Sequence, residues 1–142
     1  MLKLDVMHRQ HRAIRALLQA LGATAIDTPD GQTLLRLART TILNHVHEED
    51  LEFYSALARE AEVGALADAY YGEIRETSRQ ATAFFDACAE GGDLQAYADG
   101  FDTICRLIVQ RMDREEMRLF AAYSATVDGD DAPPDMPIGL PA

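Results

Sequence analysis

The sequence predicts an all-α protein, an up-down-up-down antiparallel four-helix bundle. Three observations predict it: segments with apolar side chains at helical spacing, short connections that contain glycine or proline, and similar segment lengths. Long helices of similar length that are joined by short turns pack antiparallel to their chain neighbours. A chain of 142 residues fits one domain with a substantial core. We assign residues 1–125 to the bundle and residues 126–142 to an acidic, Pro-rich tail.

The first two predicted helices span about residues 4–21 and 32–60. The first carries an apolar stripe that His11 interrupts, and Gly22 follows its last turn, a common place for glycine. Because His11 is in register with apolar residues, we expect its side chain to face inward. The second helix follows a turn-rich segment, with Asp30 as the expected N-cap.

The third and fourth predicted helices meet at Gly91 and Gly92. The third begins just after Gly64, and its apolar stripe has a polar middle. Asp93 is the expected N-cap of the fourth helix, which extends to about Ser124.

The second and fourth predicted helices carry the same arrangement of polar and apolar side chains, which begins at His45 and again at Arg111. In each copy a carboxylate, Glu49 or Glu115, stands one helical turn after the large polar side chain, and a bulky apolar pair follows. Residues at this spacing share one helix face, which should be buried. Because burial of unpartnered polar groups costs several kcal/mol, these side chains either satisfy one another or hold a ligand.

The four helices are expected to bring polar side chains to one level of the bundle core. Counting outward from each turn places polar residues of all four helices at that level, and the core of a bundle is where imidazole and carboxylate metal sites are built. His8 and His47 lie beside the stripes and are expected to be solvated. The inward polar set is His11, His45, Glu49, Glu73, Thr77, Arg111 and Glu115.

The pattern resembles the hemerythrin-like, or HHE cation-binding, family of four-helix bundles. The resemblance covers about residues 4–124. It implies a nonheme iron pair, held by histidines from all four helices and by carboxylates from the second and fourth. It also implies roles in binding dioxygen, in sensing oxygen or iron, or in handling reactive nitrogen and oxygen species. The motifs that carry it are His11-Arg-Ala-Ile-Arg-Ala-Leu-Leu, His45-x-x-x-Glu49-x-x-x-Phe53-Tyr54 and Glu115-Glu-x-x-Leu119-Phe120.

The chain departs from the family pattern at two places. Arg111 stands where the fourth helix of the family has a histidine, and no histidine follows His47 to supply a ligand from the third helix. Glu73 is a further candidate ligand from its periodicity alone. The metal ligands that the resemblance carries over are His11, His45, Glu49 and Glu115.

Arg111 is expected to support the ligands or to replace part of the metal. A guanidinium has no lone pair for a metal, but its planar fork pairs with two carboxylates. Between Glu49 and Glu115 it would supply part of the positive charge that an iron pair supplies. Thr77 is expected beside it at the same level.

The amino-acid composition limits the classes of binding partner that we expect. The chain has 13 basic and 24 acidic residues, which argues against nucleic acid and anionic membranes and favours cations. No apolar run has the length of a signal peptide or of a membrane span, so we expect a soluble, cytoplasmic protein. Cys88 and Cys105 are expected to lie too far apart along neighbouring helices to form a disulfide.

Our leading hypothesis is a hemerythrin-like cation-binding protein with a degenerate centre that binds at most one metal ion in a sensing or binding role. Iron, manganese and zinc all suit imidazole with carboxylate, and a small gaseous ligand is a further candidate. No catalytic constellation is recognised, so we expect no enzyme.

The alternative is a metal-free interaction module in which an arginine–carboxylate network replaces the metal centre and a protein partner or a second copy binds elsewhere. A ferritin-like oxidase ranks last, because neither inward carboxylate belongs to a Glu-x-x-His pair.

Overall fold

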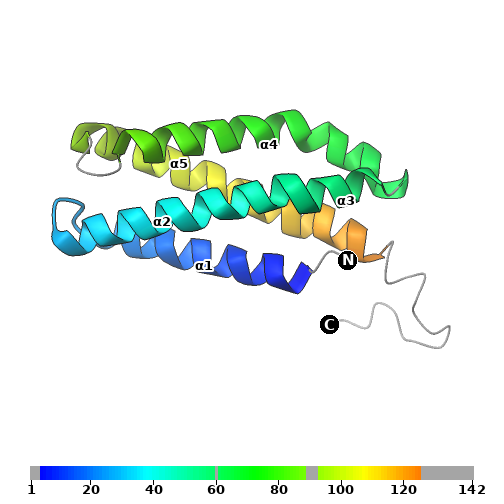
Figure 1. Ribbon diagram of the computed structural model, residues 1–142, viewed down its shortest axis with the longest axis horizontal. Helices are drawn as coiled ribbons and strands as arrows, with labels where there is room; N and C mark the ends of the chain where they lie inside the picture. Colours follow the sequence, from blue (N-terminus) through cyan, green and yellow to red (C-terminus); the bar gives the residue numbers. More distant parts are fainter. Residues whose placement is uncertain (1–3, 60, 89–92, 126–142) are drawn as a thin grey trace.

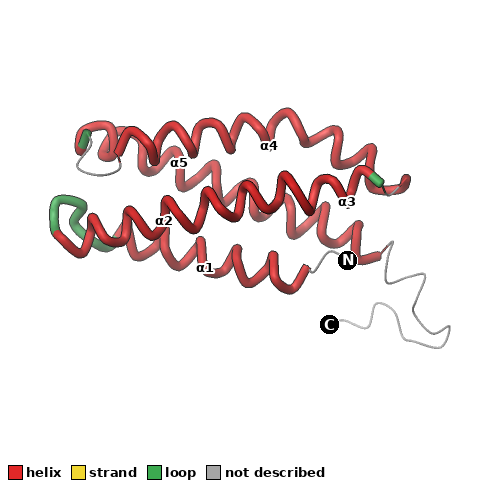
Figure 2. The backbone as a smooth tube through the Cα atoms, in the orientation of Figure 1, coloured by secondary structure: helices red, strands yellow, loops and turns green. Residues whose placement is uncertain are grey.

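The computed structural model describes residues 4–59, 61–88 and 93–125, and within them the protein is all-α, with no strand (Figure 2). The prediction of an all-α fold is confirmed. Residues 121–125 are also helical. The elements are α1 (Leu4–Gly22), α2 (Pro29–Glu48), η1 (Glu49–Phe53), α3 (Tyr54–Ala58), α4 (Ala61–Cys88), α5 (Leu94–Arg114) and η2 (Glu115–Phe120).

The helices lie side by side along their length (Figure 1). Helix α1 packs against α2 and α5, and α4 packs against α2 and α5, so each long helix has two neighbours. Segments α2, η1 and α3 follow one another without a break, and so do α5 and η2. The sequence places the start of the third helix just after Gly64, whereas Gly64 lies inside α4.

The N-terminal caps agree with the sequence in one helix and differ in the other. Asp93 caps α5 as predicted, because its side chain accepts hydrogen bonds from the backbone N–H groups of Gln95 and Ala96. The prediction of Asp30 as the cap of α2 is wrong, since the side chain of Thr28 accepts from the N–H of Gly31. The next residue is a proline, and proline suits the first helical position because it lacks an N–H and has a fixed φ.

The doubled segment adopts wide, π-helical turns in both of its copies. Element η1 begins at Glu49 and η2 begins at Glu115, the two carboxylates that occupy the same place in the repeat. Such turns insert one residue into an α-helix and are frequent at functional sites. Periodicity alone predicts uninterrupted α-helix here, so this local widening is a finding of the structure.

The buried polar level divides the core into two apolar clusters. The larger cluster holds the last turns of α1 and the first turns of α2, including Leu18 and Leu35. The smaller one gathers the other ends of the helices, including Met7 and Phe53. His11 lies between the parts of α1 that enter the two clusters, as the sequence pattern predicts.

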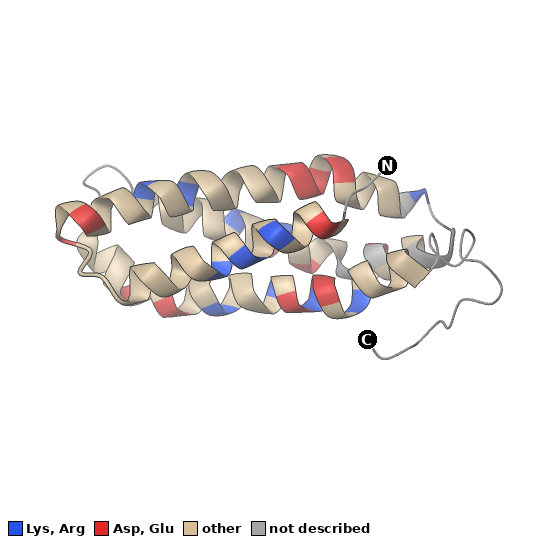
Figure 3. Ribbon diagram, turned by 90° about the horizontal axis from the view of Figure 1, so that it is seen from below, with Lys and Arg blue, Asp and Glu red and all other residues tan. Residues whose placement is uncertain are grey.

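Charged residues of both signs are interspersed along the helices (Figure 3). None of the helices in the described ranges is long and apolar enough to cross a membrane. Cys88 is buried, Cys105 is half-buried and both are free, as expected. The predicted acidic tail, residues 126–142, lies outside the described residues.

Gly31 provides a test of the turn that starts α2. A Cβ atom there would lie 2.1 Å from the carbonyl oxygen of Ala25 and 2.8 Å from Cα of Ile26. Because both contacts are to backbone, we expect Gly31→Ala to lower the free energy of unfolding by about 1–3 kcal/mol. Gly72→Ala is the matched control, since nothing lies within 4 Å of its added Cβ. In a helix interior that change should raise stability by up to about 1 kcal/mol. Urea unfolding measures both, and shifts in the same direction would contradict this packing of the turn.

Candidate metal centre

Two imidazoles and two carboxylates form a buried group at the centre of the bundle. His11 comes from α1, His45 from α2, Glu49 from η1 and Glu115 from η2. Their exposed fractions are 0% for His11, Glu49 and Glu115 and 3% for His45. One potential ligand atom from each residue lies within 4.8 Å of the other three. The structure therefore brings together the four residues that the resemblance carries over as metal ligands.

The inward atoms of this group approach one another without making hydrogen bonds. Nε2 of His11 lies 3.4 Å from Oε2 of Glu49 and 3.4 Å from Oε1 of Glu115. Nε2 of His45 lies 3.2 Å from Oε1 of Glu49. Within the described residues, both Nε2 atoms, Oε2 of Glu49 and Oε1 of Glu115 are buried and have no hydrogen-bond partner. Such atoms are costly to bury unless a ligand or a shared proton satisfies them.

The outward nitrogen of each imidazole is held by a side chain of another helix. Nδ1 of His11 lies 2.7 Å from Oε2 of Glu116, a carboxylate that also accepts from Arg15 at 2.8 Å. Nδ1 of His45 lies 2.6 Å from the amide oxygen of Gln10. Both acceptors favour the tautomer with the proton on Nδ1, which leaves the Nε2 lone pair facing the centre. A histidine that binds a metal is held in this way.

The two buried carboxylates have pKa values that shift in opposite directions. Burial alone would raise the pKa of Glu49, but the adjoining imidazoles of His11 and His45 and the charge of Arg111 hold this pKa well below its usual range. Burial and the nearby Glu49 charge raise the pKa of Glu115.

For His11, burial lowers the pKa, but the adjoining carboxylates of Glu115 and Glu49 outweigh it and raise the pKa to about 10. When no metal is bound, the His11 ring therefore carries a proton on Nε2 as well as on Nδ1. A metal ion and this proton would compete for the same Nε2 atom.

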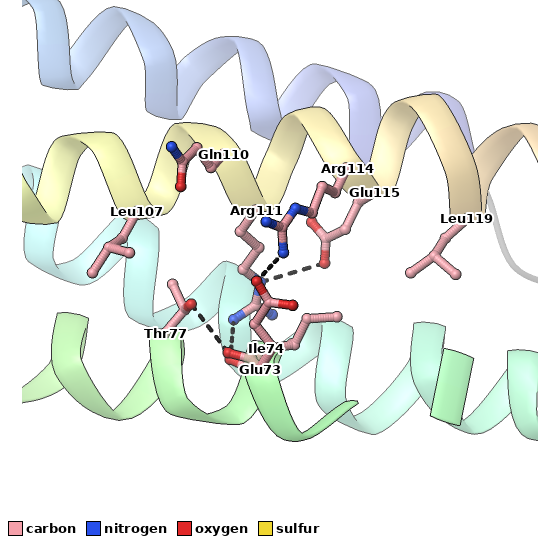
Figure 4. Close-up of a pocket in the computed structure, with 9 residues that line it drawn as sticks. All are labelled: Glu73, Ile74, Thr77, Leu107, Gln110, Arg111, Arg114, Glu115 and Leu119. Atoms are coloured by element: carbon pink, nitrogen blue, oxygen red, sulfur yellow. Dashed lines mark hydrogen bonds and ion pairs between the residues drawn. The ribbon is translucent and has the colours of Figure 1, made fainter. Parts of the chain in front are cut away.

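Arg111 is the buried cation beside the two carboxylates, as the sequence predicts. Its Nη2 donates to Oε1 of Glu49 at 3.0 Å, and its Nε donates to Oε2 of Glu115 at 3.4 Å. Its Nη1 donates to the backbone oxygen of Ile74 at 3.2 Å and to the hydroxyl of Ser78. Figure 4 shows Arg111 on α5 reaching toward Ile74 on α4. The guanidinium thus contacts one oxygen of each carboxylate and leaves the other, Oε2 of Glu49 and Oε1 of Glu115, unpartnered.

Glu73 does not lie with the group, so its predicted inward placement is wrong. Glu73 has 55% of its side chain exposed and pairs with Arg114 (Figure 4). Glu73 was misplaced by a slip of one residue, which turns a helix by about 100°. Thr77 is half-buried and lines a small cavity together with Glu49 and Arg111, beside the guanidinium as predicted. Its hydroxyl donates to the backbone oxygen of Glu73 at 3.1 Å. The inward side of α4 instead carries Ile74 and Ser78.

Four polar residues around the group were missed or were assigned to packing from the sequence. From the sequence, Tyr54 belongs to the bulky apolar pair that follows Glu49, yet its hydroxyl donates to Oε2 of Glu115 at 2.7 Å. One signal could have revealed it, because a buried tyrosine hydroxyl needs an acceptor. No spacing within a single helix links the other three, Gln10, Ser78 and Glu116, to their partners, which lie on other helices. As predicted, His8 and His47 lie outside the buried group, His8 half-buried and His47 exposed.

A helical bundle with buried imidazole and carboxylate atoms turned toward one point defines a protein with a candidate metal centre inside its core. The family model of the hemerythrin HHE cation binding domain matches residues 2–131. The chain therefore belongs to the hemerythrin HHE cation-binding domain family, which confirms the resemblance. No curated protein matches the chain significantly. No solved structure does so either.

Proposed function

We propose that this protein is a hemerythrin-like cation-binding protein whose degenerate centre holds one metal ion in a sensing or binding role. The observation that carries the proposal is the set of four buried, unpartnered atoms described above. Two imidazole nitrogens and two carboxylate oxygens fit iron, manganese or zinc, and the family points to iron. The ligands would be His11, His45, Glu49 and Glu115.

Arg111 supports a single ion rather than a pair. Its guanidinium lies against both carboxylates, at 3.0 Å from Glu49 and 3.4 Å from Glu115. A second cation at that position would be repelled by the guanidinium and would find no imidazole there. With neutral imidazoles, one divalent ion and Arg111 more than balance the two carboxylate charges. Arg111 would also orient both carboxylates through their outer oxygens.

A bound ion would supply Lewis acidity or redox chemistry and an open position for a small gaseous molecule. The protein's own residues hold the ligand atoms in place and exclude bulk water, since all four side chains are buried.

We include in the proposal the up-down-up-down topology, in which α2–η1–α3 and α5–η2 each act as one helix. The free cysteines agree with a cytoplasmic location, which is also part of it.

Metal analysis of the untagged protein tests this proposal. We expect one ion per chain after purification from metal-replete cells, and a titration of the metal-free protein that ends at one equivalent. The bound ion should raise the melting temperature, and a chelator should reverse that increase, because the ion binds the folded state. Arg111→His is the companion variant, expected to gain a second ion. Absence of stoichiometric metal in the native protein would overturn the proposal.

The contacts of Arg111 also support a second candidate, a metal-free interaction module for a protein partner or a second copy. In that case the guanidinium and the proton on His11 balance the two carboxylates without any ion. A melting temperature that responds neither to iron, manganese or zinc nor to a chelator would favour this module.

A further inference from the structure

Two tyrosines connect the buried group with the surface. Tyr54 is 7% exposed, and its hydroxyl donates to Oε2 of Glu115 at 2.7 Å. Its ring stacks on the ring of Tyr71, with centroids 6.2 Å apart and planes 13° from parallel. Tyr71 is 41% exposed. The chain of contacts therefore runs from a candidate metal ligand, through one buried ring, to a ring at the surface.

From this geometry we propose that Tyr54 and Tyr71 form a one-electron relay, which carries a strongly oxidising equivalent from the buried group to the protein surface. The origin of that equivalent rests on the proposed function: a peroxide at a redox-active ion in the centre would take up two electrons, through two passes of the relay, and two protons from water, and would leave as water and an alcohol or as two waters. The reductant would be a small thiol in solution, which meets the relay at Tyr71.

The hydrogen bond between Tyr54 and Glu115 suits the proton that must move with the electron. A phenol loses its O–H proton when it is oxidised by one electron, and a buried phenol needs an acceptor at hydrogen-bond distance. Oε2 of Glu115 is that acceptor. For a tyrosine that serves only in packing, any hydrogen-bond acceptor would be sufficient. The acceptor of Tyr54 is instead a carboxylate of the buried group, the one that also faces His11.

The transfer balances at each step. Tyr54 would give one electron toward the peroxide at the centre and its phenolic proton to Glu115, and would become a neutral radical. This radical takes one electron from Tyr71 and recovers the proton from Glu115. Tyr71 releases its own proton to water, and a thiol then returns one electron and one proton to it. The thiol becomes a thiyl radical, and the two thiyl radicals from two passes combine to a disulfide. Both tyrosines and Glu115 regain their starting state.

Arg75 determines which of the two tyrosines carries the radical. Its guanidinium carbon lies 5.6 Å from the centroid of the Tyr71 ring. A cation over an aromatic face is attracted by its electrons and so opposes their removal. The radical should therefore reside on Tyr54 until a reductant reaches Tyr71, and Tyr54 is shielded there from solvent.

The test uses the full-length, metal-free protein and an oxidant that acts from the surface. Illumination of ruthenium tris-bipyridine with persulfate removes one electron at a time from exposed side chains, and rapid freezing followed by electron paramagnetic resonance detects tyrosyl radicals. In the native protein we expect a long-lived tyrosyl signal. Tyr54→Phe should lose it. Tyr71→Phe should lose most of its yield although Tyr54 is intact, because the ring that links Tyr54 to the surface can no longer be oxidised readily.

Tyr97→Phe is the matched control. Tyr97 is buried in the other apolar cluster, where it contacts Phe84 and Phe101. The yield of the tyrosyl signal in Tyr97→Phe should therefore equal that in the native protein. An unchanged yield in Tyr71→Phe, or a persistent long-lived signal in Tyr54→Phe, would overturn the relay. If Tyr54→Phe does not fold, the comparison of Tyr71→Phe with Tyr97→Phe decides alone, since Tyr71 lies at the surface. No metal is present in this experiment, so its failure and the failure of metal binding are independent results.

Discussion

Replacement of Arg111 with leucine is expected to lower the free energy of unfolding of the metal-free protein by about 3–5 kcal/mol, the usual effect of removing one partner from a buried ion pair. Leucine fills much of the volume but leaves Glu49 and Glu115 without the cation that lies 3.0 Å and 3.4 Å from them. It also leaves the backbone oxygen of Ile74 and the hydroxyl of Ser78 without this donor. Urea unfolding in the presence of a chelator measures the loss.

Arg114→Leu is the matched control for this variant. Arg114 lies one turn from Arg111 in the same helix, and its partner Glu73 is mostly exposed. An exposed ion pair contributes about 0–1 kcal/mol, so this change should have little effect. If both variants lost the same stability, the cluster around Arg111 would not be the buried network described above.

Glu49→Ala and His45→Ala are each expected to abolish stoichiometric metal binding. Loss of a hydrogen-bonding partner outside the ligand set weakens metal affinity by about 10–100-fold, and loss of a ligand should exceed that range. Glu49 faces both imidazoles, at 3.4 Å from His11 and 3.2 Å from His45, so its removal should have the larger effect. Metal analysis and titration of the refolded variants give the measurement.

The controls for this pair are Glu52→Ala and His47→Ala. Both residues belong to the same stretch of chain, but their side chains are exposed and lie outside the buried group. They should keep one ion per chain. Retention of stoichiometric metal in Glu49→Ala would remove that carboxylate from the proposed ligand set.

Much of the helical architecture could be predicted from the sequence. Apolar periodicity located the helices, and Asp93 was recognised as a cap because an aspartate at that position can accept from the next N–H groups. Thr28 was missed because Thr28 and Asp30 both carry side-chain oxygens that can cap a helix, and only the backbone conformation decides which of them does so. The π-helical turns at Glu49 and Glu115 were missed as well, since both helical forms share nearly the same local pattern.

The sequence could predict only those parts of the candidate site that follow from the spacing of residues within a single helix. The imidazole of His45 and the carboxylate of Glu49 lie one turn apart on one stripe, and the same holds for Arg111 and Glu115. Spacing of this kind is a local property, so it predicts the inward face without knowledge of the partners. Glu73 failed this reasoning because a slip of one residue along α4 turns a side chain outward.

The sequence by itself determined that this chain forms helices and that a level of polar side chains lies inside them. The inward placement of five residues follows from helical periodicity alone, and all five are buried: His11, His45, Glu49, Arg111 and Glu115.

Only the tertiary structure decided which atoms of those side chains meet and which partners hold them from behind. Gln10 orients His45, Glu116 orients His11, and Tyr54 reaches Glu115 from another helix. The physical reason is that periodicity is set within each helix, whereas the rotation of one helix against the next is set by how all the side chains pack together.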